Sequence, residues 1–261
     1  MTTMSDIEVH APLPEIRRIG FADLRMALVS GLADFREMPS FAVFLCLFYP
    51  MAGLIIGGIM LRYDVAPLLF PLAAGFALIG PFAAIGLYEL SRRRELGLDN
   101  SWQHAFDVFR SPAKWRILEV GVLLLALFFA WLMIAQWLYA DTVGRLAPNS
   151  LTAFVRDVFT TSEGGQMFVW GNLIGFAFAV VSMSLSVISF PLLLDRHVSA
   201  AEAMLTSVRA VFENIRAMTL WGLIVAAALF VGSIPFLLGL AVVMPIFGHA
   251  TWHLYRRLIP A

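Results

Sequence analysis

His249 and His253 are four residues apart near the C-terminal end of the chain. On a helix this spacing places both imidazoles on one face, as two ligands of one metal ion would be. A zinc site needs three or four ligands, and Glu89 and Asp195 are acidic residues expected on the same side of a membrane. The sequence therefore allows a metal site at His249, His253, Glu89 and Asp195. Hydrogen-bonded anchoring of two interfacial histidines is the simpler interpretation.

The two carboxylates also have a structural interpretation. Glu89 and Asp195 each close an apolar stretch and lie next to Arg92 and Arg196. Ion pairs at the membrane surface would then hold neighbouring helices together. The functional alternative is a cation or proton site built with His253, because ionisable groups in a membrane are costly and call for a role.

Uncharged polar residues mark a second candidate site, a transport path. Asn172, Gln136, Ser182 and Ser186 lie inside long apolar stretches. Such groups usually form hydrogen bonds between helices, worth about 1 kcal/mol or less each. A path for small molecules, lipids or ions would require them to converge on a polar cavity. The centres of the stretches carry no Asp, Glu, Lys or Arg, so ion-coupled transport lacks its customary residues.

The sequence gives no support to an enzyme. It contains no nucleophile motif, no phosphate-binding loop and no glycine-rich dinucleotide turn. A buried haem would need an axial ligand deep in the membrane, and no histidine lies near the middle of a stretch. The net charge is zero, which provides no overall field to attract nucleic acid. We expect no catalytic residue, no cofactor and no nucleic-acid partner.

Long apolar stretches dominate the chain, which is 60% hydrophobic and only 14% charged. A helix needs roughly 20 apolar residues to cross the hydrocarbon core, and backbone groups in lipid must bond within the helix. The pattern predicts an all-α polytopic membrane protein with six transmembrane helices. The six stretches are 41–61, 66–88, 117–139, 168–193, 216–233 and 235–252.

The basic residues orient these helices. Of 18 Lys and Arg, only Arg62, Arg145 and Arg156 fall in loops on one side, and the other 15 fall on the opposite side. Short loops rich in Lys and Arg stay in the cytoplasm, so both termini are expected inside the bacterial inner membrane. The polar N-terminus lacks a signal-peptide pattern, and residues 1–15 are expected to form a flexible cytoplasmic tail.

An amphipathic pattern that repeats along the chain suggests three units within a single membrane domain, residues 16–261. Residues 21–37 form an amphipathic pattern too short and too charged to span, which is typical of an interfacial helix. Similar patterns follow capping-box sequences at Asn100–Gln103 and Ser199–Glu202. We predict three membrane hairpins, each preceded by a cytoplasmic interfacial helix. The units are about 21–94, 100–196 and 199–257.

Several segments of the chain are similar to an uncharacterised family of predicted bacterial integral membrane proteins. They are Arg17–Gly20, Ala33–Pro39, Phe70–Pro81, Ser189–Arg196 and Gly248–Arg257. Some members are labelled cytochrome c oxidase subunit I. This chain does not support that label, because the subunit has many more spans and several mid-membrane histidine ligands. The resemblance implies a six-span fold of unassigned chemistry and allows an accessory role beside a respiratory complex.

These observations favour a non-enzymatic scaffold or accessory subunit whose partners are the lipid bilayer and another membrane protein complex. The first alternative is a small-molecule, lipid or ion transporter that uses the polar residues of the long stretches. The second alternative is a metal- or haem-binding membrane protein centred on the histidine pair.

Overall fold

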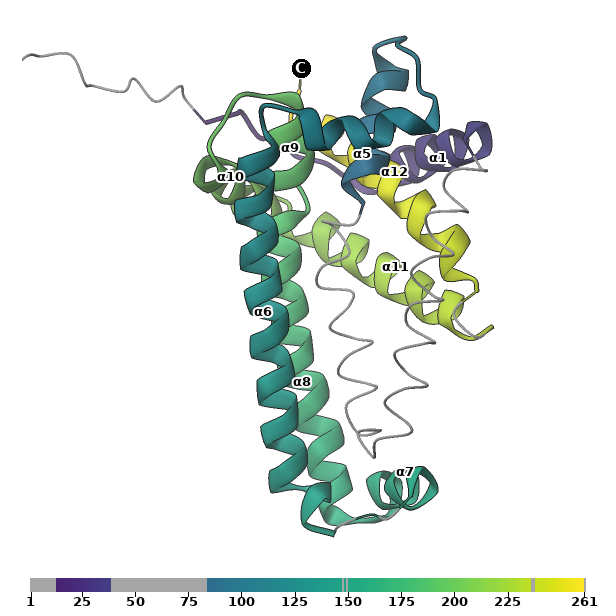
Figure 1. Cartoon of the computed structure of the whole chain (residues 1–261), viewed down its shortest axis with the longest axis vertical. Helices are drawn as coiled ribbons and strands as arrows, with labels where there is room; N and C mark the ends of the chain where they lie inside the picture. The colour runs from purple at the N-terminus through teal and green to yellow at the C-terminus, as the bar shows by residue number, and fades with distance from the viewer. Residues whose placement is uncertain (1–12, 39–83, 147, 149, 236–237, 261) are drawn as a thin grey trace, which may run out of the picture.

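The computed structural model describes residues 13–38, 84–146, 148, 150–235 and 238–260 (Figure 1). All regular elements in these ranges are helices, which confirms the all-α class. The first expected span, most of the second and most of the N-terminal tail lie outside the described residues, so those expectations stay predictions.

Two long helices form the axis of the molecule. Helix α6 (Lys114–Asp141) and helix α8 (Ser162–Ser186) run side by side (Figure 1). Trp131 on α6 packs against Phe178 on α8, with ring centroids 5.9 Å apart. At the far end of this pair lie the short helices η3 (Val143–Leu146) and α7 (Leu151–Thr160).

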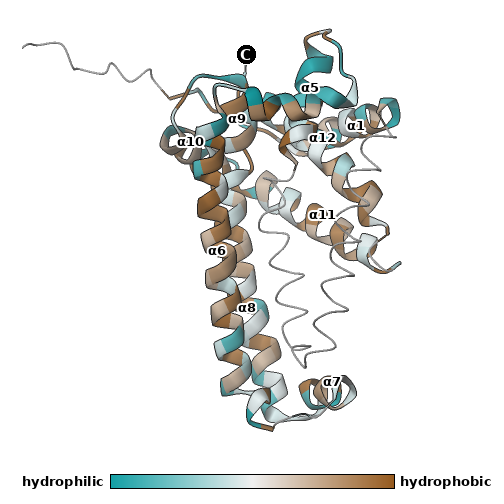
Figure 2. Ribbon diagram, viewed as in Figure 1, coloured by the Kyte–Doolittle hydropathy of each residue, from teal (hydrophilic) through white to brown (hydrophobic). Residues whose placement is uncertain are grey.

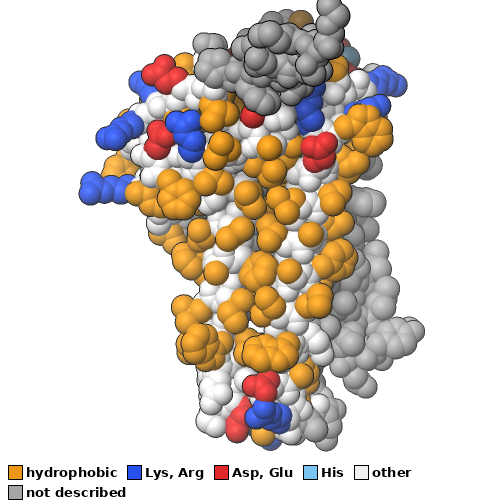
Figure 3. Space-filling model, turned by 90° about the vertical axis from the view of Figure 1, so that its left-hand side faces the viewer, with side chains coloured by type: hydrophobic (Ala, Val, Ile, Leu, Met, Phe, Trp, Pro, Cys, Tyr) orange, Lys and Arg blue, Asp and Glu red, His pale blue; other side chains and the backbone are white. Residues whose placement is uncertain are grey.

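The outer surface of the α6–α8 pair suits lipid. Bulky apolar side chains stay exposed along both helices, among them Phe129 and Trp137 on α6 and Trp170 and Phe176 on α8. Figures 2 and 3 show this apolar surface between charged groups at the two ends of the helices. A soluble protein rarely leaves so large an apolar surface uncovered, so these helices are best explained as membrane-crossing.

Three segments of the described residues are long and apolar enough to cross a membrane: Lys114–Asp141, Ser162–Asp195 and Ile215–Ser233. They correspond to the third, fourth and fifth expected stretches. The last expected stretch lies on helix α12 (Leu240–Leu258), which is not among these candidates. In Figure 1 the C-terminal end of α11 (Ile215–Ser233) and the N-terminal end of α12 come together away from α6, at a level near the middle of that helix. The count of six spans and the hairpin arrangement stay predictions.

The fourth stretch breaks between α8 and the short helix α9 (Ser189–Asp195). Pro191 has no amide hydrogen to donate to the carbonyl of Val187, so the helical ladder is interrupted there. At the same break, the amide of Ile188 donates to the Ser207 hydroxyl, at 3.1 Å, on helix α10 (Ala200–Glu213). The break therefore joins the end of the span to α10.

One end of the molecule gathers helices from distant parts of the sequence. Helix α1 (Phe21–Glu37), helix α5 (Ile85–Glu95), α9 and α12 meet there (Figure 1), and we call these four elements the polar layer. Helix α1 has the bounds expected for the interfacial helix, 21–37. It crosses α12 at Gly31, where a Cβ atom would lie 2.5 Å from the backbone nitrogen of Ala250. Only glycine permits this close approach.

The two expected capping boxes have different outcomes. Ser199 and Glu202 cap α10 reciprocally, with the Glu202 amide 3.2 Å from the Ser199 hydroxyl and the Ser199 amide 2.8 Å from the Glu202 carboxylate. The box expected at Asn100 does not form. Asp99 accepts the Ser101 amide at 3.0 Å, and the 3₁₀ helix η2 (Trp102–Arg110) follows. The N-cap residue of η2 is Ser101, and its side chain makes no capping hydrogen bond.

Candidate functional site

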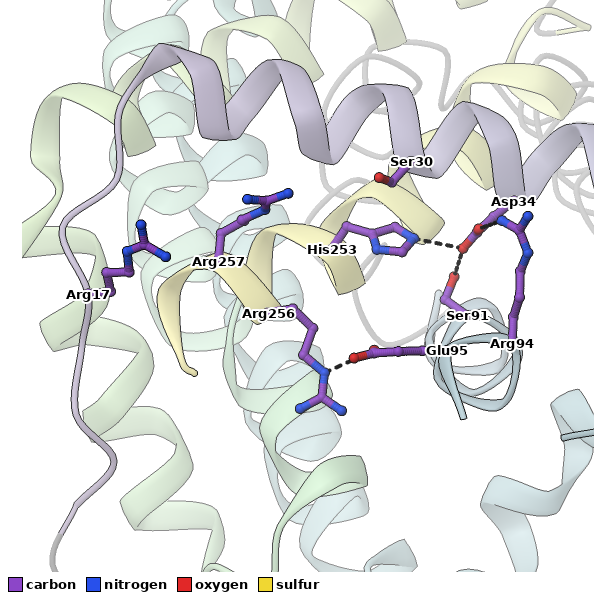
Figure 4. A pocket seen from close by; sticks show the side chains of 9 residues that line it. All are labelled: Arg17, Ser30, Asp34, Ser91, Arg94, Glu95, His253, Arg256 and Arg257. Atoms are coloured by element: carbon purple, nitrogen blue, oxygen red, sulfur yellow. Dashed lines mark hydrogen bonds and ion pairs between the residues drawn. The ribbon is translucent and has the colours of Figure 1, made fainter. Parts of the chain in front are cut away.

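The carboxylate of Asp34 is the centre of a buried network. Asp34 is 1% exposed on the face of α1 that meets α5 and α12. It accepts a hydrogen bond from the Ser91 hydroxyl at 2.5 Å and lies 2.9 Å from Nε2 of His253. It also forms an ion pair with Arg94 (Figure 4). One acidic side chain thus joins three helices.

The network continues from Ser91 to His249. Nδ1 of His249 lies 2.8 Å from the Ser91 hydroxyl oxygen. Because Ser91 gives its one proton to Asp34, the imidazole must be the donor of this second bond. A continuous chain of hydrogen bonds therefore runs from His253 through Asp34 and Ser91 to His249. His249 is completely buried, and its Nε2 makes no hydrogen bond within the described part of the chain.

The electrostatics of Asp34 follow from these partners. Burial alone would raise the pKa of its carboxyl group, because desolvation penalises the charged form. The hydrogen bonds from His253, Ser91 and Arg94 and the charge of His253 outweigh burial and hold the Asp34 pKa below its ordinary value of 3.8. Asp34 is therefore a stably ionised buried acid at neutral pH.

Asp195 is the centre of a second network on α9. Its carboxylate accepts the Tyr255 hydroxyl at 2.6 Å and pairs with Arg256 at 2.8 Å. The Arg256 guanidinium also bonds Glu95 at 3.0 Å and lies 5.0 Å from the centre of the Trp252 ring. Burial, together with the bond to Asp195, raises the pKa of Tyr255. Asp195 thus ties α9 to the C-terminal turn of α12.

Glu89 has a more local partner. Its carboxylate is 5% exposed and accepts two hydrogen bonds from Arg92, at 2.8 and 2.9 Å, one turn along α5. The four expected metal-site residues are therefore divided. The histidine pair lies with Asp34, Asp195 with Tyr255 and Arg256, and Glu89 with Arg92.

Within the described ranges, no three His, Cys, Asp or Glu side chains are arranged to hold a metal ion. The histidine pair does have a carboxylate partner, Asp34, but Nδ1 of His249 is 3.9 Å from it and bonds Ser91 instead. The metal assignment stays a prediction.

The residues of the expected transport path lie apart from these networks. Asn172 and Gln136 are exposed on the surfaces of α8 and α6. The Asn172 amide donates to the carbonyl of Phe168 on its own helix, at 2.7 Å. Ser182 and Ser186 are buried, and the Ser186 hydroxyl donates to the Ser182 carbonyl at 2.6 Å. None of the four lines the pockets at the polar layer, and the path stays a prediction.

The sequence analysis did not identify Asp34 as a site residue, although it lies in the amphipathic segment 21–37. The signal was nevertheless present. Leu24, Ala27, Gly31 and Asp34 recur at spacings of three and four residues and form the buried face of α1. An acid in register with small residues on one face indicates a buried, partnered carboxylate.

A family comparison agrees with the membrane character of the helices. Residues 69–195 match the family model described as "Predicted integral membrane protein (DUF2189)". The match confirms, over this segment, the resemblance expected from the sequence. The function of that family is unknown. No curated protein and no solved structure matches the chain.

Proposed function

We propose that this chain is a non-enzymatic scaffold or accessory subunit of a membrane complex in the bacterial inner membrane. The observation that supports this role is the use of the buried charged groups. Asp34, Glu89 and Asp195 are each bound by an arginine, and Asp34 and Asp195 join separate helices. Such bonding commits these three carboxylates to contacts that stabilise the polar layer.

Next to the polar layer lies a surface that can contact lipid or another membrane protein. Trp102, Phe106 and Phe109 on η2 are 54%, 49% and 71% exposed, and Phe212 on α10 is 66% exposed. Aromatic side chains are enriched both at membrane interfaces and at protein contacts. A structural subunit would use these aromatic side chains to anchor the polar layer at the membrane surface.

Purification of the tagged protein in mild detergent, with mass spectrometry of co-eluting proteins and metals, tests the role. An accessory subunit gives a stoichiometric membrane partner. The partner should be lost from the Asp34→Asn variant, because this substitution breaks the bonds between the helices of the polar layer. It should be retained by Glu213→Gln, which removes only the exposed pair with Arg209. A metal-free homomer would contradict the role and make transport the leading alternative. A stoichiometric bound metal would instead favour a site at the histidine pair.

We also propose that both termini are cytoplasmic. The basic residues support this orientation, because the polar layer and the start of α6 lie at one end of the molecule (Figure 1), where most Lys and Arg occur. In a Cys46→Ser background, Arg110→Cys and Gly165→Cys place a thiol at opposite ends of α6–α8. An impermeant maleimide should label Gly165→Cys in spheroplasts and Arg110→Cys only in inverted vesicles. The reverse labelling pattern would contradict the proposed orientation and place the polar layer outside the cytoplasm.

A further inference from the structure

An open pocket of about 520 Å³ lies between α1, α5, α12 and the extended segment before α1 (Figure 4). This volume falls in the range of small-molecule sites. The charged side chains of its lining are four arginines, two acids and one histidine. They are Arg17, Arg94, Arg256, Arg257, Asp34, Glu95 and His253. With four positive and two negative groups the lining carries a charge of +2, before any proton on His253.

The arginines divide into two pairs with different roles. Arg94 is bound by Asp34 and Glu37, and Arg256 is bound by Glu95 and Asp195. These two guanidinium groups therefore hold the walls of the pocket together. The excess positive charge belongs to the other pair, Arg17 and Arg257.

Arg17 and Arg257 have donors to spare. The nearest acid to Arg257 is Asp23, at 3.9 Å, and the arginine side chain is 37% exposed. Arg17 is exposed and makes no ion pair within the described ranges. Figure 4 shows both side chains extending into the space between the N-terminal segment and α12. A ligand at this position meets two guanidinium groups with unused donors.

The backbone beneath Arg17 is fixed in place. Its amide donates to the Leu258 carbonyl at 2.8 Å, and its carbonyl accepts the Asn214 side-chain amide at 3.2 Å. The next amide but one, from Ile19, donates to the Asn214 side-chain oxygen at 2.8 Å. The extended segment is therefore held by Asn214, between α10 and α11, and by the end of α12, so little backbone entropy is lost when a ligand binds.

We propose that this pocket binds the phosphate group of an anionic ligand. Arg17 and Arg257 are the principal donors, because guanidinium groups match phosphate oxygens with paired hydrogen bonds. His253 lies at the inner wall of the pocket, where its Nε2 is hydrogen-bonded to Asp34. The phosphate comes either from the headgroup of an anionic lipid or from a soluble phosphorylated molecule, and the chemistry of recognition is the same.

The test uses the full chain in nanodiscs and has two arms. In the soluble arm, inorganic phosphate is titrated against protein in zwitterionic lipid, with chloride at matched ionic strength as the control anion. In the lipid arm, native mass spectrometry counts the phosphatidylglycerol retained by the protein. Each arm compares the native chain with Arg17→Gln/Arg257→Gln, with Arg257→Lys and with the control Arg209→Gln, an arginine that is outside the pocket lining and pairs with Glu213.

We expect binding in at least one arm. The double variant should weaken it about tenfold or more, Arg257→Lys should weaken it partly, and Arg209→Gln should not change it. Binding of inorganic phosphate without retained phosphatidylglycerol identifies a soluble ligand, and retention of the lipid identifies a headgroup. The proposal is overturned if neither arm shows binding, if the double variant binds like the native chain, or if chloride competes equally. Arg257→Lys keeps the charge and so separates loss of the site from loss of the fold.

Discussion

In the polar layer, Asp34 and Asp195 bond to side chains on other helices, whereas on and next to the α6–α8 pair several polar side chains bond to their own helix. Asp34 and Ser91 connect α1, α5 and α12. In contrast, Thr142 beyond α6 and Asn172 and Ser186 on α8 each donate to the carbonyl four residues earlier. The long pair is held together by side-chain packing, such as that of Trp131 against Phe178.

The difference reflects the surroundings of the two regions. Lipid cannot solvate an unpaired polar group, so a polar residue on a lipid-facing helix satisfies itself locally. At the membrane surface, charged groups are cheaper to bury and can supply directional bonds between helices. We therefore expect substitutions of polar residues to destabilise the polar layer strongly and the α6–α8 pair weakly.

The largest effect is expected from Asp34→Asn. The substitution removes the charge that Arg94 and His253 face. Loss of one partner of a fully buried pair costs about 3–5 kcal/mol. We expect about 2–3 kcal/mol, because Arg94 is one-third exposed and keeps Glu37. Thermal unfolding in one detergent measures the change, with Glu213→Gln as the control. Equal unfolding midpoints for Asp34→Asn and Glu213→Gln would contradict the strong dependence of the polar layer on Asp34.

A slightly smaller effect is expected from Gly31→Ala. The added methyl group would lie 2.5 Å from the backbone of Ala250, and α1 would have to move away from α12. Overpacking of this kind costs about 1–3 kcal/mol. Gly165→Ala on α8 is the matched control, because no atom lies within 4 Å of its added Cβ. Stability that fell equally in both variants would show that the close crossing of α1 and α12 does not matter.

Acid should weaken the polar layer selectively. The pKa of Asp34 is lower in the fold than its ordinary value of 3.8. Its contribution to stability is therefore complete above about pH 4, where the unfolded carboxyl group is also ionised, and is lost as the pH falls through the folded pKa. The native chain should lose more stability below pH 4 than Asp34→Asn does. Parallel acid profiles of the two proteins would contradict the ionised state assigned to Asp34.

The smallest effect is expected from Asn172→Ala and Gln136→Ala. Both side chains are exposed on the α6–α8 pair, and surface substitutions usually change stability by less than about 0.5 kcal/mol. Transport assays with proteoliposomes of the two variants sharpen this prediction. A loss of solute flux without a loss of stability would support a transport path through these residues and argue against a purely structural pair.

Several of the helices could be predicted from sequence, because apolar length and capping are local signals. The patterns of residues 21–37 and of the third, fourth and fifth stretches indicated helices that the structure contains, and Ser199 with Glu202 marked the start of α10 correctly. Glu89 and Asp195 both bind arginines, as expected, but only the pair of Asp195 with Arg256 joins two helices, because Glu89 pairs with Arg92 within α5.

The bonds that cross the polar layer could not be predicted, because they join residues far apart in sequence. Asp34 lies 57 residues from Ser91 and 219 residues from His253. Hydropathy shows that α12 is apolar, but it does not show that α1 covers the helix at Gly31. The spacing of Asp34 places it on the small-residue face of α1, but it does not show which side chains meet the carboxylate there.

The most direct test of the account is a double-mutant cycle between Asp34→Asn and His253→Gln, measured by unfolding of the full chain in one detergent. If the polar layer depends on the bond between these residues, the two effects should be non-additive by about 1 kcal/mol or more. Effects that add to within about 0.3 kcal/mol would contradict the claim that Asp34 holds α1 to α12.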